Sequence, residues 1–199
     1  MLPPLDRHFF EPSARVVAPA LLGCWLVRQT AQGVSGGPIV ETEAYLDGDP
    51  ACHAYVGRTT RNRVMWGPPG VAYVYFIYGN HYCVNAVCRP DGIAEAVLIR
   101  AIEATVGLEF MFERRPAKTA RQLTSGPGKL CAALGIDRKL DGADLCDPAS
   151  PLFIAENPDR ADFLRHAGPV IATKRVGITK AADLALRFYL RRSDFVSRT

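Results

Sequence analysis

Two runs of β-branched and aromatic residues stand out in the pattern of hydrophobic positions along the chain. They cover Val71 to Tyr78 and Tyr82 to Arg89, and only Gly79 to His81 separates them. Strand-forming runs joined by such a short segment, with Gly and Asn in it, predict a β-hairpin. Tyr78 then lies at the tip, where a large ring has little room within its own sheet, so we expect it to project outward.

The rest of the pattern predicts short strands and short helices. Ile39 to Tyr45 is a strand-like run that contains Glu41 and Glu43, which are two residues apart and therefore on one face. The other predicted elements are strands over Cys24 to Arg28 and Ala94 to Ile102, helices over Ser13 to Leu22, Gly107 to Arg115 and Ser125 to Gly135, a turn over Gln32 to Pro38, and an irregular segment over Asp47 to Pro69. Beyond Gly135, short strands alternate with turns.

Length and composition predict one globular domain over residues 1–199. Of the 199 residues, 48% are hydrophobic and 22% are charged, which is ordinary for a protein with its own core. The longest apolar stretches, Val16 to Val27 and Gly70 to Tyr78, are shorter than a bilayer span, and the N-terminal pattern is not that of a secretory signal. The six cysteines form no C-x-x-C pair, so we expect reduced thiols in a cytoplasmic protein without a zinc site.

Charge is unevenly distributed, although the net charge is only +4. The segment between Asp49 and Asp91 has no acidic residue, yet it holds four arginines, five of the seven tyrosines, Trp66 and two of the four histidines. Cationic and aromatic side chains without nearby acids are typical of surfaces that bind phosphates and stack on bases. Each aromatic residue taken alone is more simply explained as part of the core of an ordinary strand.

Several familiar catalytic motifs are absent from the sequence. Ser125 to Lys129 looks like part of a phosphate-binding loop, but Leu123 and Leu130 stand where that motif needs Gly and Ser or Thr. No G-x-G-x-x-G follows a strand and no G-x-S-x-G occurs, so neither dinucleotide binding nor serine hydrolysis has support. Glu43 precedes Tyr45, His53 and the arginine-bearing segment, and a general base beside stacking rings suits chemistry on a nucleotide.

Blocks of residues along the chain carry a resemblance to a known family. The blocks are Val40 to Tyr45, Ala51 to Tyr55, Gly57 to Met65, Gly67 to Gly70, Ala72 to Gly79 and Ala96 to Ala101, with shorter ones at Leu21 to Gly23, Gly126 to Cys131 and Arg187 to Tyr189. In residue type, order and spacing they resemble the alkyladenine (3-methyladenine) DNA glycosylase family, bacterial branch. The resemblance covers about Ala18 to Tyr189.

The resemblance implies a single compact α/β domain of the α+β type, with a curved, mostly antiparallel sheet, flanking helices and a protruding β-hairpin that inserts into DNA. It implies a monofunctional DNA glycosylase of base excision repair, which flips a damaged purine out of the duplex and hydrolyses its N-glycosidic bond to leave an abasic site. Alkylated purines of the 3-methyladenine type are the implied substrates, and hypoxanthine and ethenoadenine stay open. The implied partner is double-stranded DNA with a damaged purine, bound by a nucleoid-associated monomer without metal, cofactor or membrane.

The resemblance also implies roles for individual residues. Glu43 is the general base, Tyr45, His53 and Tyr75 line the base pocket, Asn85 excludes the exocyclic amine of guanine, Tyr78 fills the gap left by the flipped base, and Arg100 contacts a phosphate beside the lesion. Arg58, Arg61 and Lys129 are expected to contact the DNA backbone. Asn80 stands where the family commonly has Met, which leaves the depth of the wedge open. Glu41 is expected to be structural or solvated, with Glu41→Gln a mild change.

Two other functions are compatible with parts of the sequence. One is a protein of the same fold that binds damaged DNA with weak or no cleavage, and the presence of Glu43 favours the enzyme over it. The other is an RNA-binding module with aromatic residues on its sheet, but no RNP-like motif occurs.

The length of the hairpin turn decides whether Tyr75 and Asn85 can share the pocket that the resemblance implies. A two-residue turn would place Tyr75 opposite Val84 and send Asn85 to the other face of the sheet. A three-residue loop over Gly79 to His81 sets Tyr75 directly across from Asn85. We therefore expect an odd loop, or a bulge, within Tyr78 to Tyr82.

Overall fold

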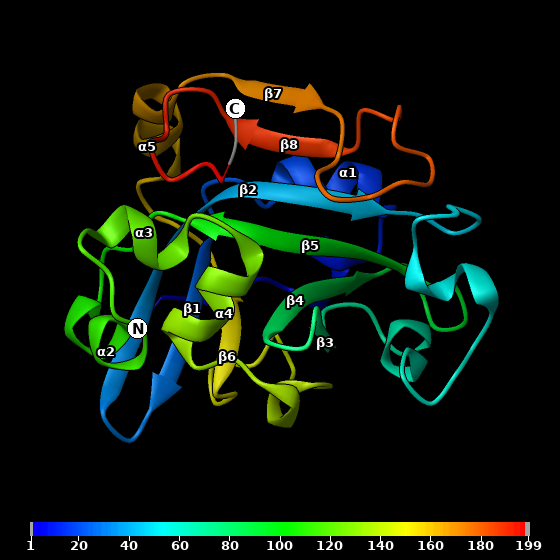
Figure 1. Cartoon of the computed structure of the whole chain (residues 1–199), viewed down its shortest axis with the longest axis horizontal. Helices are drawn as coiled ribbons and strands as arrows, with labels where there is room; N and C mark the ends of the chain where they lie inside the picture. Colours follow the sequence, from blue (N-terminus) through cyan, green and yellow to red (C-terminus); the bar gives the residue numbers. More distant parts are fainter. Residues whose placement is uncertain (1, 198–199) are drawn as a thin grey trace.

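The computed structural model describes residues 2–197, which are built around an eight-stranded antiparallel sheet (Figure 1). The strands are β1 (Trp25–Thr30), β2 (Gly33–Tyr45), β3 (Ala72–Ile77), β4 (His81–Cys88), β5 (Glu95–Ile102), β6 (Leu152–Ala155), β7 (Val170–Thr173) and β8 (Arg187–Leu190). Their order is β3-β4-β5-β2-β1-β6, with β8 pairing both β2 and β7. The expected antiparallel sheet and single compact α+β domain are confirmed.

Strand β2 is the element that positions the two predicted carboxylates. Its first half pairs with β1, and its second half pairs with β5 from Ile39 onward. Strand β8 pairs with the other edge of β2 over Glu41–Glu43, so this stretch lies between two strands, as Figure 1 shows. Both Glu41 and Glu43 are consequently inaccessible to solvent.

The turn expected over Gln32 to Pro38 is wrong, because β2 already begins at Gly33 and the turn is confined to Ala31 and Gln32. The two glycines that suggested a turn are needed for close packing within the strand. A Cβ on Gly36 would lie 2.2 Å from the carbonyl oxygen of Leu26, and one on Gly37 would lie 1.8 Å from that of Glu103. Glycine inside a strand often marks such an approach of another backbone.

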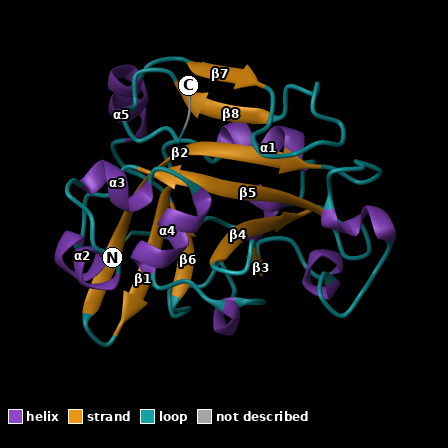
Figure 2. Cartoon of the chain, viewed as in Figure 1, coloured by secondary structure: helices purple, strands orange, loops and turns teal. Residues whose placement is uncertain are grey.

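Helices flank the sheet (Figure 2). They are α1 (Ala14–Ala20), α2 (Leu108–Arg114), α3 (Ala120–Thr124), α4 (Pro127–Leu134) and α5 (Arg160–Ala167), with short 3-10 helices η1 (Arg7–Phe10), η2 (His53–Val56), η3 (Arg63–Trp66) and η4 (Arg138–Leu140). The predicted helices correspond to α1, α2 and α4, whereas α3 and α5 were not predicted. Helix α3 has only five residues and α5 buries only Ala167, so neither carries a strong apolar stripe.

Buried side chains form a main core and a smaller cluster beneath the hairpin. The main core lies between the sheet and the helices α1 and α4. The smaller cluster joins Tyr73 and Tyr75 of β3 to Cys52 and Met65 of the segment that follows β2. The candidate site opens at this second cluster. No helix within residues 2–197 is long and apolar enough to cross a membrane.

Candidate active site

A cavity of about 310 Å³ lies between the hairpin, the η2 segment and the loop that joins β7 to β8. Its walls include Tyr45, His53, Tyr75, Asn85, Tyr78 and Arg100, six residues singled out from the sequence, together with Val176 and Gly177 of the β7–β8 loop. Cavities of this size accommodate small organic ligands. The structure therefore brings these six predicted residues together around one space.

His53 and Tyr75 form the aromatic wall of the cavity. Their ring centroids are 4.4 Å apart at an interplanar angle of 72°, which is an edge-to-face arrangement. A ring nitrogen of His53, Nδ1, lies 3.0 Å from the hydroxyl of Tyr73, a residue that the sequence did not single out. Burial, and then the positive charge of Arg61, lower the pKa of His53 below its usual value. His53 is therefore a neutral imidazole at neutral pH.

Asn62 holds His53 in place. Its side-chain amide donates to the carbonyl oxygens of His53 and Gly57, each over 2.9 Å, and its Oδ1 accepts from the Thr59 amide at 2.7 Å. Asn62 is itself buried. These bonds replace the missing secondary structure of this segment and fix the position of the His53 ring.

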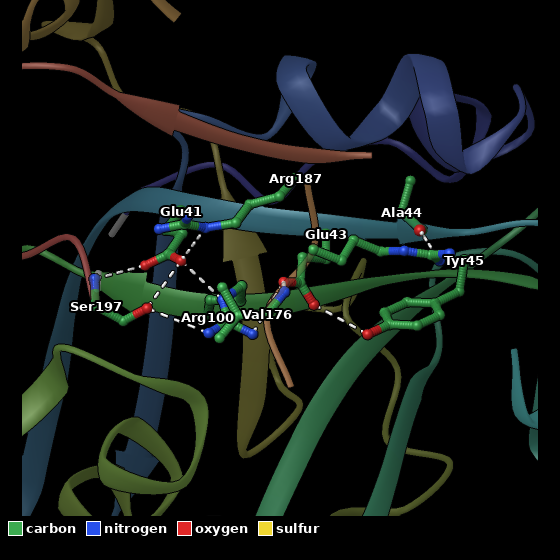
Figure 3. Close-up of polar contacts among 9 residues, drawn as sticks. Glu41, Glu43, Ala44, Tyr45, Arg100, Val176, Arg187 and Ser197 are labelled. Atoms are coloured by element: carbon green, nitrogen blue, oxygen red, sulfur yellow. Dashed lines mark hydrogen bonds and ion pairs between the residues drawn. The ribbon is translucent and has the colours of Figure 1, made fainter. Parts of the chain in front are cut away.

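The carboxylate of Glu43 contacts Tyr45, Arg100 and Val176, three residues that line the cavity (Figure 3). Its Oε2 accepts a hydrogen bond from the hydroxyl of Tyr45 at 2.9 Å, and its Oε1 accepts one from the backbone amide of Val176 at 2.8 Å. Arg100 Nη1 lies 3.1 Å from the same Oε1. Three donors thus surround an acceptor that has no solvent exposure.

Tyr45 is held between Glu43 and Arg175. The guanidinium carbon of Arg175 lies 4.7 Å from the centre of the Tyr45 ring, a cation–π distance. Arg175 also forms a bidentate, fully buried ion pair with Asp49 and donates to the carbonyl of Ala44 at 3.0 Å. Burial, and then the charge of Glu43, raise the pKa of Tyr45 well above its usual value, so its phenol stays protonated.

Arg100 lies in the interior, which differs from the expected contact with a DNA phosphate. Its side chain is 7% exposed and bridges the carboxylates of Glu41 and Glu43, at 2.7 and 3.1 Å. Burial alone would lower the pKa of Arg100, but Glu43 and Glu41 outweigh it and raise the pKa above the usual value. Arg100 therefore forms ion pairs with the two carboxylates, and it also lines the cavity.

Asn85 shares the cavity with Tyr75, but by a different register from the one expected. The turn comprises Tyr78 to Asn80, one residue earlier than predicted, so Ile77 pairs with His81 and Tyr75 pairs with Cys83. Direct pairing of Tyr75 with Asn85 is therefore wrong, since Asn85 pairs with Tyr73 and donates to its carbonyl oxygen at 3.0 Å. The odd loop is confirmed, and it leaves both side chains on one face.

Tyr78 occupies the hairpin tip at the rim of the cavity. Its side chain is 75% exposed, and its φ of 54° lies in the left-handed region that residues other than Gly and Asn seldom adopt. The Tyr78 hydroxyl approaches Gly177 on the opposite rim, where an added Cβ would lie 3.8 Å from it. An exposed aromatic ring held in a strained backbone conformation indicates a functional constraint.

The three remaining predicted residues, Arg58, Arg61 and Lys129, are all exposed. Arg61 lies on the hairpin side, where it donates to the carbonyl of Phe76 at 3.2 Å. Lys129 is on α4, whose first turn packs against His81, because a Cβ on Gly128 would lie 2.9 Å from that ring. Both cations therefore flank the hairpin.

Arg175 and Val176 are the functional residues that the sequence analysis missed. Arg175 reaches Asp49 across 126 positions of the chain, and the Val176 amide reaches Glu43 across 133. No local pattern reports contacts of this separation. The only local signal was Asp49 itself, an acid at the edge of an otherwise basic and aromatic segment.

Two cysteines, Cys52 and Cys83, line the cavity as thiols. Burial raises the pKa of Cys52 to about 11 and also raises that of Cys83. Neither is therefore activated as a nucleophile near neutral pH. Within residues 2–197, no three His, Cys, Asp or Glu side chains are grouped as metal ligands, and all six cysteines are unbridged.

An aromatic cavity beside a buried carboxylate, with a protruding tyrosine at its rim, suits an enzyme that acts on a base taken out of its stack. Residues 8–194 match the family model described as methylpurine-DNA glycosylase (MPG). The chain belongs to this family, which confirms the resemblance inferred from the sequence.

Curated relatives match along nearly their whole length. The chain is similar to proteins named "Putative 3-methyladenine DNA glycosylase" from Methanoculleus marisnigri (51% identical) and Carboxydothermus hydrogenoformans (47%), and each match covers 98% of both chains. A protein of the same name from Rhodopseudomonas palustris strain HaA2 is 51% identical, with 98% of this chain and 90% of that protein covered.

Proposed function

We propose that this protein is a monofunctional DNA glycosylase that removes damaged purines from double-stranded DNA, with 3-methyladenine-type alkylated purines as the main substrates. The observation that carries the proposal is the position of Glu43, whose carboxylate contacts residues that line an aromatic cavity of about 310 Å³. Family membership supports the same reaction. Hypoxanthine and ethenoadenine are the further lesions to test.

The first step is extrusion of the damaged nucleotide. Unstacking costs a few kcal/mol and is cheapest for a base that pairs badly. Tyr78 offsets part of this cost, since its exposed ring is free to occupy the gap in the duplex. The faces of Tyr45 and Tyr75 favour an electron-poor, cationic purine by roughly 1 to 2 kcal/mol when desolvated. Cationic alkylated purines are therefore both better bound and better leaving groups.

The second step is hydrolysis of the bond between the base and the sugar carbon C1′. An ionised carboxylate offers about four acceptor positions. Tyr45 donates to Oε2, and Val176 and Arg100 lie at Oε1, so we place the attacking water at the remaining position on Oε2. Glu43 takes a proton from this water as its oxygen bonds to C1′. The C1′–N bond breaks, its electron pair leaves with the base, and an abasic site remains.

Neutral His53 beside the aromatic wall suits recognition of the base. A neutral imidazole has one donor and one acceptor nitrogen, so it can bind a purine edge without repelling a cationic base. Arg58, Arg61 and Lys129 are exposed, and we expect them to contact phosphates of the DNA backbone. Action as a monomer associated with the nucleoid stays part of this proposal.

Single-turnover excision tests this proposal on duplexes that carry 3-methyladenine, hypoxanthine, ethenoadenine or 7-methylguanine. The wild-type protein should release the alkylated adenine and leave an alkali-labile abasic site. Glu43→Gln should bind the same duplex with wild-type affinity and release the base at least about a hundredfold more slowly. Binding of lesion duplex without release by the wild-type protein would identify the alternative, a damaged-DNA-binding protein of the same fold.

A further inference from the structure

A second buried carboxylate, Glu41, lies two residues before Glu43 on β2 and binds the C-terminal segment. Its side chain has no solvent exposure. Arg100 Nε and Arg187 Nε each donate to Glu41 Oε1 at 2.7 Å. Ser197 adds two more bonds, from its backbone amide to Oε2 at 2.7 Å and from its hydroxyl to Oε1 at 2.9 Å (Figure 3).

Each nitrogen of the Arg100 guanidinium has a different partner. Nε donates to Glu41, Nη1 lies at Glu43, and Nη2 donates to the Ser197 hydroxyl at 3.2 Å. The Ser197 hydroxyl therefore accepts from Arg100 and donates to Glu41. Because all three nitrogens of this planar guanidinium have partners, it cannot rotate away from Glu43 without breaking the other two contacts.

The backbone around Arg100 does not fix its side chain by regular strand pairing. Between β2 and β5 the register passes from Ile39↔Ile102 to Glu41↔Ala101 and then to Thr42↔Ile99. Val40 and Arg100 are left without a cross-strand partner in this ladder, as at a β-bulge. Bulges redirect side chains, so the orientation of Arg100 depends on the side-chain contacts at its end.

We propose that Ser197 is a positioning residue for the excision reaction, which acts by orienting Arg100 against Glu43. The inference rests on the proposed function. Ser197 is not among the residues that line the cavity, so we assign it a positioning role and not a catalytic one. Ser197 acts through Glu41 and Arg100. The segment that contains Ser197 forms no strand and is anchored by the buried side chain of Val196.

Charged and titratable groups face Glu43 from every surrounding element. They are Glu41 and Tyr45 of β2, Cys83 of β4, Arg100 of β5, Arg175 of the β7–β8 loop and Arg187 of β8. Of these, Arg100 is the cation that lies within ion-pair distance of the Glu43 carboxylate, at 3.1 Å. Displacement of Arg100 would remove this ion pair and leave the Glu43 carboxylate without the contact that orients it.

Ser197→Ala is the decisive variant, because it keeps the backbone bond to Glu41 and removes only the hydroxyl. Single-turnover excision of 3-methyladenine should slow about tenfold, with affinity for the lesion duplex unchanged. Ser197→Thr retains a hydroxyl and should restore the excision rate. The matched control is Ser193→Ala, since Ser193 Oγ accepts from the Phe195 amide at 3.3 Å in the same segment without reaching Glu41.

A wild-type excision rate in Ser197→Ala would overturn the inference, as would an equal effect of Ser193→Ala. Failure of the wild-type protein to excise any lesion would instead refute the proposed function. In that case hydrogen exchange of the Arg100 Nε–H, followed by NMR, still tests the inference. Ser197→Ala should accelerate exchange at Arg100 and leave it unchanged at Arg160, whose Nε donates to Leu22 O far from Ser197. Equal exchange rates at Arg100 in the wild-type protein and in Ser197→Ala would contradict the inference.

Discussion

Tyr45 and Glu43, two residues apart on β2, are joined by a hydrogen bond from the Tyr45 phenol to Glu43 Oε2 over 2.9 Å. Alternate residues of a strand share a face, so the sequence spacing places both side chains toward the cavity. The ring that would stack on the base is thereby coupled to the carboxylate that would activate water. Burial and the charge of Glu43 keep Tyr45 protonated, so it remains a donor throughout the neutral pH range.

Tyr45→Phe tests this coupling, because it keeps the ring and removes the donor. Excision should slow about tenfold while the affinity for lesion duplex is retained, since one hydrogen bond to a charged group is worth about 1.5–3 kcal/mol. Single-turnover rates and duplex titrations measure the two quantities. Tyr75→Phe is the control, because Tyr75 lines the same cavity and its hydroxyl interacts with Cys83 instead of Glu43. Equal slowing in both variants would show that the Tyr45 hydroxyl acts through general packing.

Glu41→Gln and Glu43→Gln should separate stability from catalysis. Glu43→Gln should fold normally and lose excision. Glu41→Gln leaves the buried Arg100 and Arg187 without their shared anion, so we expect a loss of about 3 kcal/mol in the free energy of unfolding. This replaces the mild effect expected from the sequence, which could not show that Glu41 is buried. Urea denaturation of both variants measures the difference in stability. Similar midpoints would refute the structural role assigned to Glu41.

Stability should also depend on pH through Glu41. Burial alone would raise its pKa, but Arg100, the Ser197 amide and Arg187 outweigh it and lower the pKa below 4.5. The ionised group therefore contributes stability that is present above about pH 4.5 and is lost as the pH falls through the lowered pKa. Glu41→Gln should show a shallower loss of stability in this acid range than the wild-type protein.

Tyr78→Ala should weaken binding to lesion duplex more than binding to the same lesion in single-stranded DNA. The ring is exposed and would fill the space of the flipped base, a role that only a duplex requires. Tyr78→Gly is the matched variant, because Gly removes the same ring but tolerates the observed φ of 54°. Equal weakening by Ala and Gly, measured by fluorescence anisotropy, would assign the effect to the ring. Equal losses on duplex and single strand would contradict it.

The sequence predicted the hairpin and the common face of Glu41 and Glu43 because these features depend on near neighbours. Ile77 and His81 pair across a three-residue turn, and the alternation of a strand follows from its geometry. The exact pairing of Asn85 was missed because moving the turn by one residue shifts the register by two and leaves every side chain on the same face. The local pattern determines which face of the sheet each side chain takes, and packing determines which residues pair across the hairpin.

The surroundings of the carboxylates could not be predicted in the same way. Arg100 lies 59 residues from Glu41, and Ser197 lies 156 residues from it. A buried arginine has the same appearance in the sequence as one on a DNA-binding surface, so nothing in the sequence contradicted the phosphate contact that the resemblance implied for Arg100. Its neighbours Ile99 and Ala101 are buried, and a charged residue within such a run was the available sign of an internal ion pair.

Asn85→Ser should widen the range of lesions. The smaller side chain removes bulk from the cavity wall, so a purine with an exocyclic amine at the position found in guanine gains room. It also removes the bond to the Tyr73 carbonyl, at a cost of about 1 kcal/mol in the free energy of unfolding. Excision of 7-methylguanine, relative to 3-methyladenine, measures the effect. An unchanged ratio would show that Asn85 supports β3 without selecting the base.

The buried pair of Asp49 and Arg175 should be the main anchor of the β7–β8 loop over the cavity. Arg175→Met keeps the length of the stem but leaves Asp49 buried and unpaired, so we expect a loss of about 3–5 kcal/mol in the free energy of unfolding. The loss should be smaller in the double variant Asp49→Asn/Arg175→Met, which has no uncompensated charge.

The preceding residue supplies the control for this loop. Lys174 pairs with Asp183 at 2.7 Å, but both side chains are exposed, so Lys174→Ala should leave the melting temperature unchanged. Arg175→Met should in addition slow excision, because Arg175 packs on Tyr45 and precedes Val176, whose amide donates to Glu43. Thermal unfolding and single-turnover rates on the three variants test both effects. A double variant no more stable than Arg175→Met would show that Asp49 is not the partner that matters.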